Sequence, residues 1–147
     1  MRFLLVMLVL TTGVLVAAPG AQAADPIRIY QNQATGDCLF DTNVRGLGAD
    51  VCYWTDDTRW VVHLWPDNTV RLGNVETGRC ISDEWGIGLT SAGCNDSENQ
   101  SWWVTYWGDD TRRFQNQLTG HCLDYTRDNG LRTWECNSGE NQSWYAR

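Results

Sequence analysis

The sequence predicts an all-β domain made of three copies of one unit of about four strands. When the 147-residue chain is shifted against itself by 42 positions, its cysteines, tryptophans and several glycines align without a gap. Within each copy, short runs rich in β-branched and aromatic residues alternate with Gly, Asn and Asp, which is the pattern of strands and turns. Beyond the N-terminal segment, no stretch has the apolar spacing of i, i+3, i+4 and i+7 that an amphipathic helix needs.

The first 23 residues have a different composition from the rest. Arg2 precedes an apolar run that ends at Val16, and the small-residue segment Ala21-Gln22-Ala23 follows. This is the pattern of a cleaved secretory signal, and the run is shorter than the roughly 20 apolar residues of a membrane-spanning helix. We therefore expect residues 24–147 to form one soluble domain that is secreted into the extracellular space. A retained N-terminal anchor is the alternative.

Three copies follow the signal, at about residues 27–63, 64–105 and 106–147. The most restrictive equivalent positions are Cys38, Cys80 and Cys122; Cys52, Cys94 and Cys136; and Trp60, Trp102 and Trp144. A fixed period of this size indicates units that bury their apolar faces only when they fold together. Three units of four short strands give the strand count of a β-trefoil, whereas a β-propeller needs at least four blades.

The cysteines are expected to form disulfides, because six cysteines in an exported chain are typical of a disulfide framework. No Cys-x-x-Cys occurs, which disfavours a zinc site. The simplest of the possible pairings closes one bridge in each copy: Cys38 with Cys52, Cys80 with Cys94, and Cys122 with Cys136. A closed loop of about 15 residues stabilises the fold by roughly 3 kcal/mol. We expect no metal and no cofactor.

The charge excludes one class of partner. Without Arg2, the chain has 10 arginines, no lysine and 18 acidic residues, so its net charge is near −8. Nucleic-acid binding needs a basic stripe that releases counterions, and the arginines here are scattered among acids. We therefore expect no nucleic-acid partner.

The tryptophan that every copy shares predicts a common core, because each copy needs a large apolar anchor. We expect Trp60, Trp102 and Trp144 to be buried. Gln100 and Gln142 are expected to satisfy buried backbone groups beside that core.

Two copies end in Gln-x-Trp, at Gln100-Ser101-Trp102 and Gln142-Ser143-Trp144, and each copy has Gly-x-Cys-Leu or Gly-x-Cys-Ile near its start. With these motifs the chain resembles the ricin-type β-trefoil lectin domain over about residues 27–147. The first copy departs from the pattern, with Thr58-Arg59-Trp60 in place of Gln-x-Trp. The resemblance implies a non-catalytic module that binds galactose-like or pentose-containing glycans, xylan among them, without membrane insertion. A separate secreted enzyme or toxin chain is a further expected partner.

The resemblance places sugar contacts at three positions of each copy: two residues after the first cysteine, two before the second, and directly before Gln-x-Trp. The third copy has an acid, an indole and an amide there, Asp124, Trp134 and Asn141. The second copy has Ser82, Ala92 and Asn99, and the first has Phe40, Asp50 and Asp57. Only the third copy has an acid, an aromatic ring and an amide at these three positions.

This set suits a sugar. A carboxylate accepts strong hydrogen bonds from neighbouring hydroxyls, an amide donates and accepts, and an indole covers the C–H face of the ring. Gln142 completes the predicted carbohydrate-binding set, and Arg132 and Tyr125 are close enough in sequence to join its rim. A purely structural role for Asp124, Trp134 and Asn141 stays open at this point.

Catalysis is not expected. The adjacent acids Asp56-Asp57 and Asp109-Asp110 are expected in turns, since neighbours on an extended strand point to opposite faces and cannot flank one bond. His63 and His121 are expected to be exposed and without partners. The alternative function is that of a secreted β-trefoil that binds a protein target, as a protease inhibitor or as the receptor-binding component of a toxin.

Overall fold

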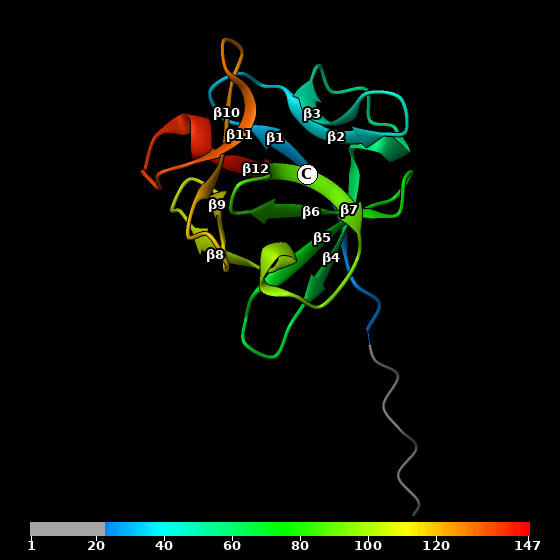
Figure 1. Cartoon of the computed structure of the whole chain (residues 1–147). Helices are drawn as coiled ribbons and strands as arrows, with labels where there is room; N and C mark the ends of the chain where they lie inside the picture. Colours follow the sequence, from blue (N-terminus) through cyan, green and yellow to red (C-terminus); the bar gives the residue numbers. More distant parts are fainter. Residues whose placement is uncertain (1–22) are drawn as a thin grey trace, which may run out of the picture.

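The computed structural model describes residues 23–147, which form a closed six-stranded barrel and three hairpins (Figure 1). The predicted secretory signal lies outside the described residues except for Ala23. The twelve strands are β1 (Ile27–Asn32), β2 (Cys38–Thr42), β3 (Gly46–Asp50), β4 (Arg59–Leu64), β5 (Val70–Asn74), β6 (Arg79–Glu84), β7 (Gly88–Gly93), β8 (Trp102–Tyr106), β9 (Thr111–Asn116), β10 (Cys122–Thr126), β11 (Gly130–Trp134) and β12 (Trp144–Ala146). Within residues 23–147, no helix has the length and apolar character needed to cross a bilayer.

The barrel is closed by antiparallel pairing alone. The ring runs β1–β4–β5–β8–β9–β12 and returns to β1, so each copy contributes two neighbouring strands. The other two strands of each copy form a hairpin: β2–β3, β6–β7 or β10–β11. The second strands of the three hairpins contact one another. This arrangement confirms the predicted β-trefoil.

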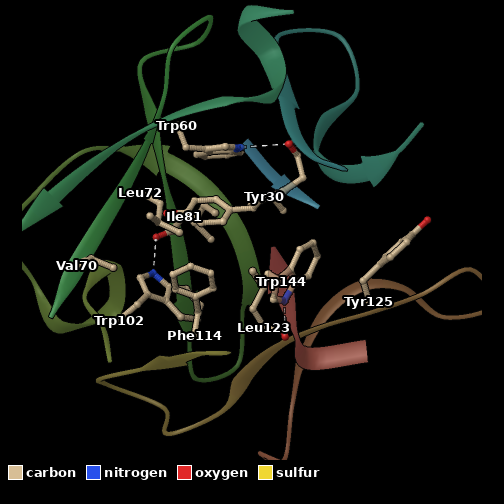
Figure 2. Close-up of a cluster of buried hydrophobic side chains, with 11 residues drawn as sticks. Tyr30, Trp60, Val70, Leu72, Ile81, Trp102, Phe114, Leu123, Tyr125 and Trp144 are labelled. Carbon is tan, nitrogen blue, oxygen red and sulfur yellow. Dashed lines mark hydrogen bonds between the residues drawn. The ribbon is translucent and has the colours of Figure 1, made fainter. Parts of the chain in front are cut away.

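The core is built by equivalent residues of the three copies (Figure 2). Trp60, Trp102 and Trp144 are all buried, as the repeat predicts. Each donates its indole N–H to a backbone carbonyl in the hairpin of its own copy, at 3.1–3.3 Å. The tryptophans therefore join barrel and hairpin within each copy while they share one core.

The three disulfides are those that the spacing predicts, Cys38–Cys52, Cys80–Cys94 and Cys122–Cys136. Each has a Cα–Cα distance of 5.0 Å. The first cysteine of every pair begins or lies in a hairpin strand and is buried. Each bridge thus fixes a hairpin to the segment that leads to the next barrel strand.

Three short 3-10 helices, η1 (Asp56–Thr58), η2 (Glu98–Gln100) and η3 (Glu140–Gln142), precede the core tryptophans. They are too short for a helical sequence period. Asp56 and Asp57 lie in η1, and Asp109 and Asp110 lie in the turn after β8. Both acidic pairs are therefore in turns, as predicted.

Tyr30 in β1 gives a prediction about alkaline pH. Burial raises the pKa of its phenol from 10.0 to about 12. Because the folded-state pKa is the higher one, the buried neutral phenol contributes fully to stability below pH 10, and this contribution is lost as the pH rises towards 12. An ultraviolet titration of tyrosinate should show a late step that Tyr30→Phe removes. If the titration curve of Tyr30→Phe equals that of wild type at high pH, the late step does not belong to Tyr30.

Candidate functional site

The predicted site lies on the hairpin β10–β11. Asp124 in β10 pairs across the hairpin with Arg132 in β11, and Cys122 pairs with Trp134. Because alternate residues of a strand face the same side, Asp124, Arg132 and Trp134 share one face of the hairpin. Asp124 is 3% exposed, whereas Trp134 is 53% exposed. The structure thus places a nearly buried carboxylate and an open indole on one surface.

Arg132 connects these two residues. Its Nε donates to Oδ1 of Asp124 at 3.0 Å, and its guanidinium carbon lies 4.3 Å from the centre of the Trp134 ring. The cation therefore neutralises the acid and stacks on the indole at once. The sequence marked Arg132 only as a neighbour of the site, and its position opposite Asp124 makes it a central member.

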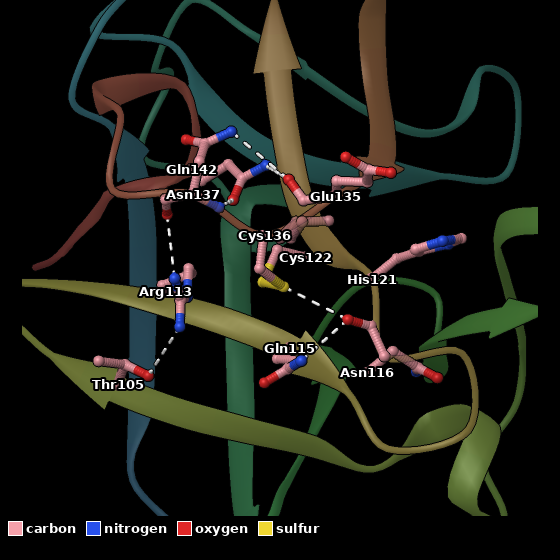
Figure 3. The surroundings of a disulfide bond; sticks show 12 residues. Thr105, Arg113, Gln115, Asn116, His121, Cys122, Glu135, Cys136, Asn137 and Gln142 are labelled. Atoms are coloured by element: carbon pink, nitrogen blue, oxygen red, sulfur yellow. Dashed lines mark hydrogen bonds between the residues drawn. A yellow bond between two sulfur atoms is a disulfide. The ribbon is translucent and has the colours of Figure 1, made fainter.

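Gln142 holds the acid from the other side. Its Nε2 donates to Oδ2 of Asp124 at 3.2 Å and to the carbonyl of Glu135 at 2.9 Å. Its Oε1 accepts from the backbone N–H of Asn137 at 2.8 Å, and Figure 3 shows this cluster beside the Cys122–Cys136 disulfide. Gln142 is 0% exposed, so it has no surface for a ligand. It orients Asp124 and fixes the backbone, which is the framework role that the repeat predicts. The prediction that Gln142 also belongs to the carbohydrate-binding set is wrong, because its side chain is fully buried.

The remaining two candidates lie apart from each other. Asn141 is exposed in η3, and its backbone carbonyl accepts from Nδ2 of Asn32 at 2.9 Å. Tyr125 is buried, and its hydroxyl donates to Asp37 of the first copy at 3.1 Å. Burial, together with that hydrogen bond, raises the pKa of the Tyr125 phenol. Asn141 can reach a ligand at the surface, whereas Tyr125 joins two copies and is not on the rim.

The equivalent surface of the first copy is filled by an aromatic ring. Phe40 is buried and lies so close over Gly48 that a Cβ there would meet its Cζ at 2.7 Å. The guanidinium of Arg45 covers the ring at 4.2 Å and pairs with Asp50 at 3.0 Å. This hairpin therefore has no carboxylate at the position of Asp124.

The second copy contains an acid that the sequence comparison missed. Glu84 accepts from Nδ2 of Asn99 at 2.6 Å and from the hydroxyl of Ser82 at 3.4 Å. Glu84 lies two residues beyond Ser82 on the same face of β6, which is the signal that could have identified it. Glu84 and Asn99 line a cavity of about 470 Å³ together with Leu118. With Ala92 at the position of Trp134, this cavity has no indole.

Both histidines have partners, so the prediction that they are exposed and unpartnered is wrong. Nδ1 of His63 lies 2.7 Å from Oδ2 of Asp25. The ring of His121 packs edge-on against Trp85, with centroids 5.2 Å apart. Asp25 lies 38 residues from His63, and Trp85 lies 36 residues from His121, so no local sequence pattern marks these two contacts.

Residues 56–130 match the model of a family described as ricin-type β-trefoil lectin domain-like. No curated protein matched the sequence. Among residues 23–147, no group of three or more His, Cys, Asp or Glu side chains is arranged to hold a metal ion.

Solved structures share the fold. The designed three-fold symmetric protein ThreeFoil has a TM-score of 0.74 at 16% identity, covering 82% of this chain and 96% of ThreeFoil. The ricin B-like lectin of Macrolepiota procera, solved with lactose, has a TM-score of 0.70 at 12% identity, covering 86% and 97%. A mosquitocidal holotoxin has a TM-score of 0.74 at 15% identity, covering 84% of this chain and 16% of the toxin. These likenesses concern the fold alone.

Proposed function

The chain belongs to the family of ricin-type β-trefoil lectin domain-like proteins, and from this premise we propose that it is a non-catalytic carbohydrate-binding module that acts outside the cell. The observation that carries the proposal is the face of hairpin β10–β11 with Asp124, Arg132 and Trp134 in contact. The two equivalent hairpins lack this combination. We therefore assign the main glycan site to the third copy.

The chemistry of this face favours a neutral polyol with one apolar side. Each oxygen of Asp124 already accepts one hydrogen bond, from Arg132 or from Gln142, and a carboxylate has about four acceptor positions. Acceptor capacity thus remains for sugar hydroxyls at the small exposed edge. Arg132 has further N–H donors for ring or hydroxyl oxygens, and Trp134 supplies the surface for the C–H face.

We propose galactose-like or pentose-containing glycans as the ligand class, in line with the family resemblance. One open site with a few contacts gives weak binding, on the order of millimolar to tens of micromolar. A polymeric glycan raises the effective affinity through multivalency. We also propose a separate secreted enzyme or toxin chain as a partner, by analogy with the mosquitocidal holotoxin, in which the similar part makes up 16% of a longer toxin chain.

The proposal is tested by exchanging Trp134 for alanine and probing an array of galactosyl and xylan-type glycans. We expect wild type to bind a subset of the array and Trp134→Ala to lose at least about tenfold in affinity, since the platform for the C–H face is gone. Trp54, which is 58% exposed in the first copy, provides the control: Trp54→Ala should bind like wild type.

Two outcomes would overturn the proposal. One is that wild type binds no glycan of the array. The other is that Trp134→Ala and wild type bind equally. Retention on immobilised proteases, without binding to glycans, would favour the protein-directed alternative.

A further inference from the structure

A second cavity begins where the proposed glycan site ends. It measures about 260 Å³ and is lined by His121, Thr133, Trp134 and Glu135. Trp134 therefore borders two spaces: the face with Asp124 and Arg132, and this cavity. Thr133 alternates with Trp134 along β11, so it lies on the other side of the hairpin from Arg132, and Glu135 follows directly after the strand.

Trp85 of the second copy lies next to the cavity, because it contacts His121, which is one of the lining residues. It begins the turn between β6 and β7, is 63% exposed, and packs against His121. We call the cavity and Trp85 the junction pocket, because its residues come from the second and third copies. An exposed indole in the wall of a small cavity, with a second exposed indole beside it, is typical of a ligand surface rather than of a framework.

The junction pocket lies at a position where all three copies differ, with Asp37, Arg79 and His121. His121 is equivalent to Arg79, which reaches back to the first copy and pairs with Asp41 at 2.9 Å. His121 instead packs on Trp85, while Asp83, the equivalent of Asp41, accepts bonds from the hydroxyls of Thr119 and Thr133. The ring of His121 thus contacts Trp85 and lines the cavity instead of pairing with the acid of the preceding copy.

The backbone around the pocket is fixed. The carbonyl of His121 accepts from the N–H of Asn116 at 2.8 Å, and the carbonyl of Glu135 accepts from Gln142 at 2.9 Å. The hydroxyl of Thr133 donates to Asp83 at 2.9 Å, so its oxygen is left to accept a hydrogen bond. The pocket therefore offers acceptors, at Thr133 and Glu135, next to the indole of Trp134.

On the basis of the proposed function, we propose that the junction pocket binds a second sugar ring, so that the module recognises an oligosaccharide whose two rings lie on either side of Trp134. The volume is near the lower end of ligand pockets, which begin at roughly 300 Å³, and suits a single ring. Hydroxyl donors match Thr133 and Glu135, and the C–H faces match Trp85 and Trp134. The acid beside the opening disfavours an anionic ligand.

The test compares one-ring and longer probes: galactose against lactose, and xylose against xylotriose. Binding is followed by NMR through the indole N–H signals of the tryptophans. For wild type we expect at least one longer probe to bind about five- to tenfold more tightly than its monosaccharide. The signal of Trp85 should move with the longer probe and stay in place with the monosaccharide.

Variants separate this inference from the proposed function. Trp85→Ala should remove the advantage of the longer probe and leave the monosaccharide affinity unchanged, whereas Trp134→Ala should weaken both. Trp54→Ala, a matched exposed indole that does not line the pocket, should change neither.

If monosaccharide binding depends on Asp124 while Trp85→Ala retains the full advantage of the longer probe, the junction pocket is wrong and the proposed function stands. Equal affinity of wild type for both members of each probe pair also overturns the pocket. If wild type binds none of the four saccharides, both proposals are wrong.

Discussion

Replacing Asp124 by asparagine is expected to lower the affinity for glycan by at least about 30-fold. The substitution keeps the shape of the side chain but removes the charge that strengthens its hydrogen bonds to sugar hydroxyls, each of which is worth roughly 1.5–3 kcal/mol when one partner is ionised. A loss of about 2 kcal/mol corresponds to about 30-fold in Kd. Asparagine also turns one acceptor into a donor, which opposes the donor of Gln142 or of Arg132.

The matched control is Asp50→Asn in the first copy. Asp50 also pairs with an arginine on a hairpin, Arg45 at 3.0 Å, so the control removes the same charge from a hairpin ion pair that is more exposed than that of Asp124. Titration with the best glycan of the array, together with thermal unfolding of both variants, separates lost binding from lost folding. If Asp124→Asn is folded and binds like wild type, Asp124 does not contact the sugar.

The repeat made the scaffold predictable in detail. The 42-residue offset identified Trp60, Trp102 and Trp144 as core residues and predicted the cysteine pairs. It did so because each copy needs the same apolar anchor and the same disulfide. The same comparison selected Asp124 and Trp134 by their difference from the other copies. These inferences depend on positions within one copy, where spacing in sequence and position on a strand are directly related.

Contacts between side chains of different kinds were harder to predict. Arg132 lies directly opposite Asp124 only because of the hairpin register, which the sequence did not specify. Glu84 was missed because the comparison looked for an acid at Ser82, the position equivalent to Asp124, which lies two residues before Glu84. The 42-residue offset shows which residues of the three copies are equivalent. It does not show which acidic side chain an arginine or an asparagine will contact.

Contacts between copies were the least predictable. Asp41, Asp83 and Tyr125 are equivalent by the 42-residue offset, yet each joins its neighbouring copy in a different way. The partners of Asp41 are 36 to 50 residues away. Such pairs form only when the three copies close the barrel, so no local pattern marks them. At the junction between the second and third copies, His121 lines a pocket.

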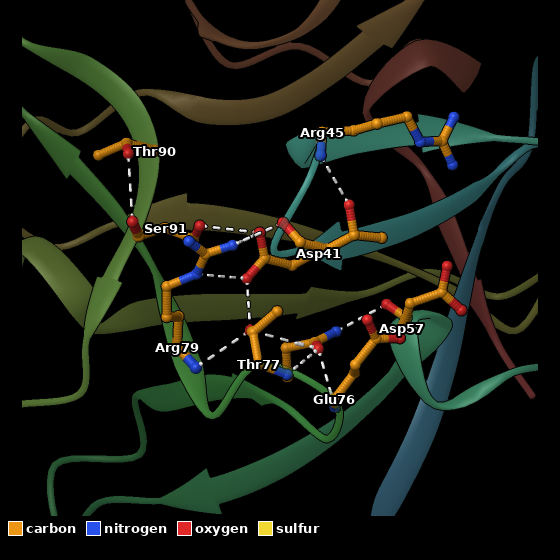
Figure 4. A network of polar contacts seen from close by, with 10 residues as sticks. Asp41, Arg45, Asp57, Glu76, Thr77, Arg79, Thr90 and Ser91 are labelled. Carbon is orange, nitrogen blue, oxygen red and sulfur yellow. Dashed lines mark hydrogen bonds and ion pairs between the residues drawn. The ribbon is translucent and has the colours of Figure 1, made fainter.

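Replacing Asp41 by alanine is expected to lower the free energy of unfolding by about 3 kcal/mol. Asp41 is 0% exposed and accepts from Thr77 at 2.5 Å, from Ser91 at 2.9 Å, and from two nitrogens of Arg79 at 2.9 Å, all in the second copy (Figure 4). Removing one partner of a buried ion pair costs about 3–5 kcal/mol. The lower end applies because the Arg79 side chain is 32% exposed and regains some water.

Asp83→Ala provides the matched comparison, since Asp83 is the buried equivalent of Asp41 and accepts from two hydroxyls instead of a guanidinium. Losing those two bonds, and with them a buried charge, should cost only about 1–2 kcal/mol. Urea unfolding with the disulfides intact measures both values by linear extrapolation. Equal losses for the two variants would show that the ion pair to Arg79 contributes nothing beyond the hydroxyl contacts. A larger loss for Asp41→Ala would establish that this pair holds the first and second copies together, where the third copy has a histidine and a pocket instead.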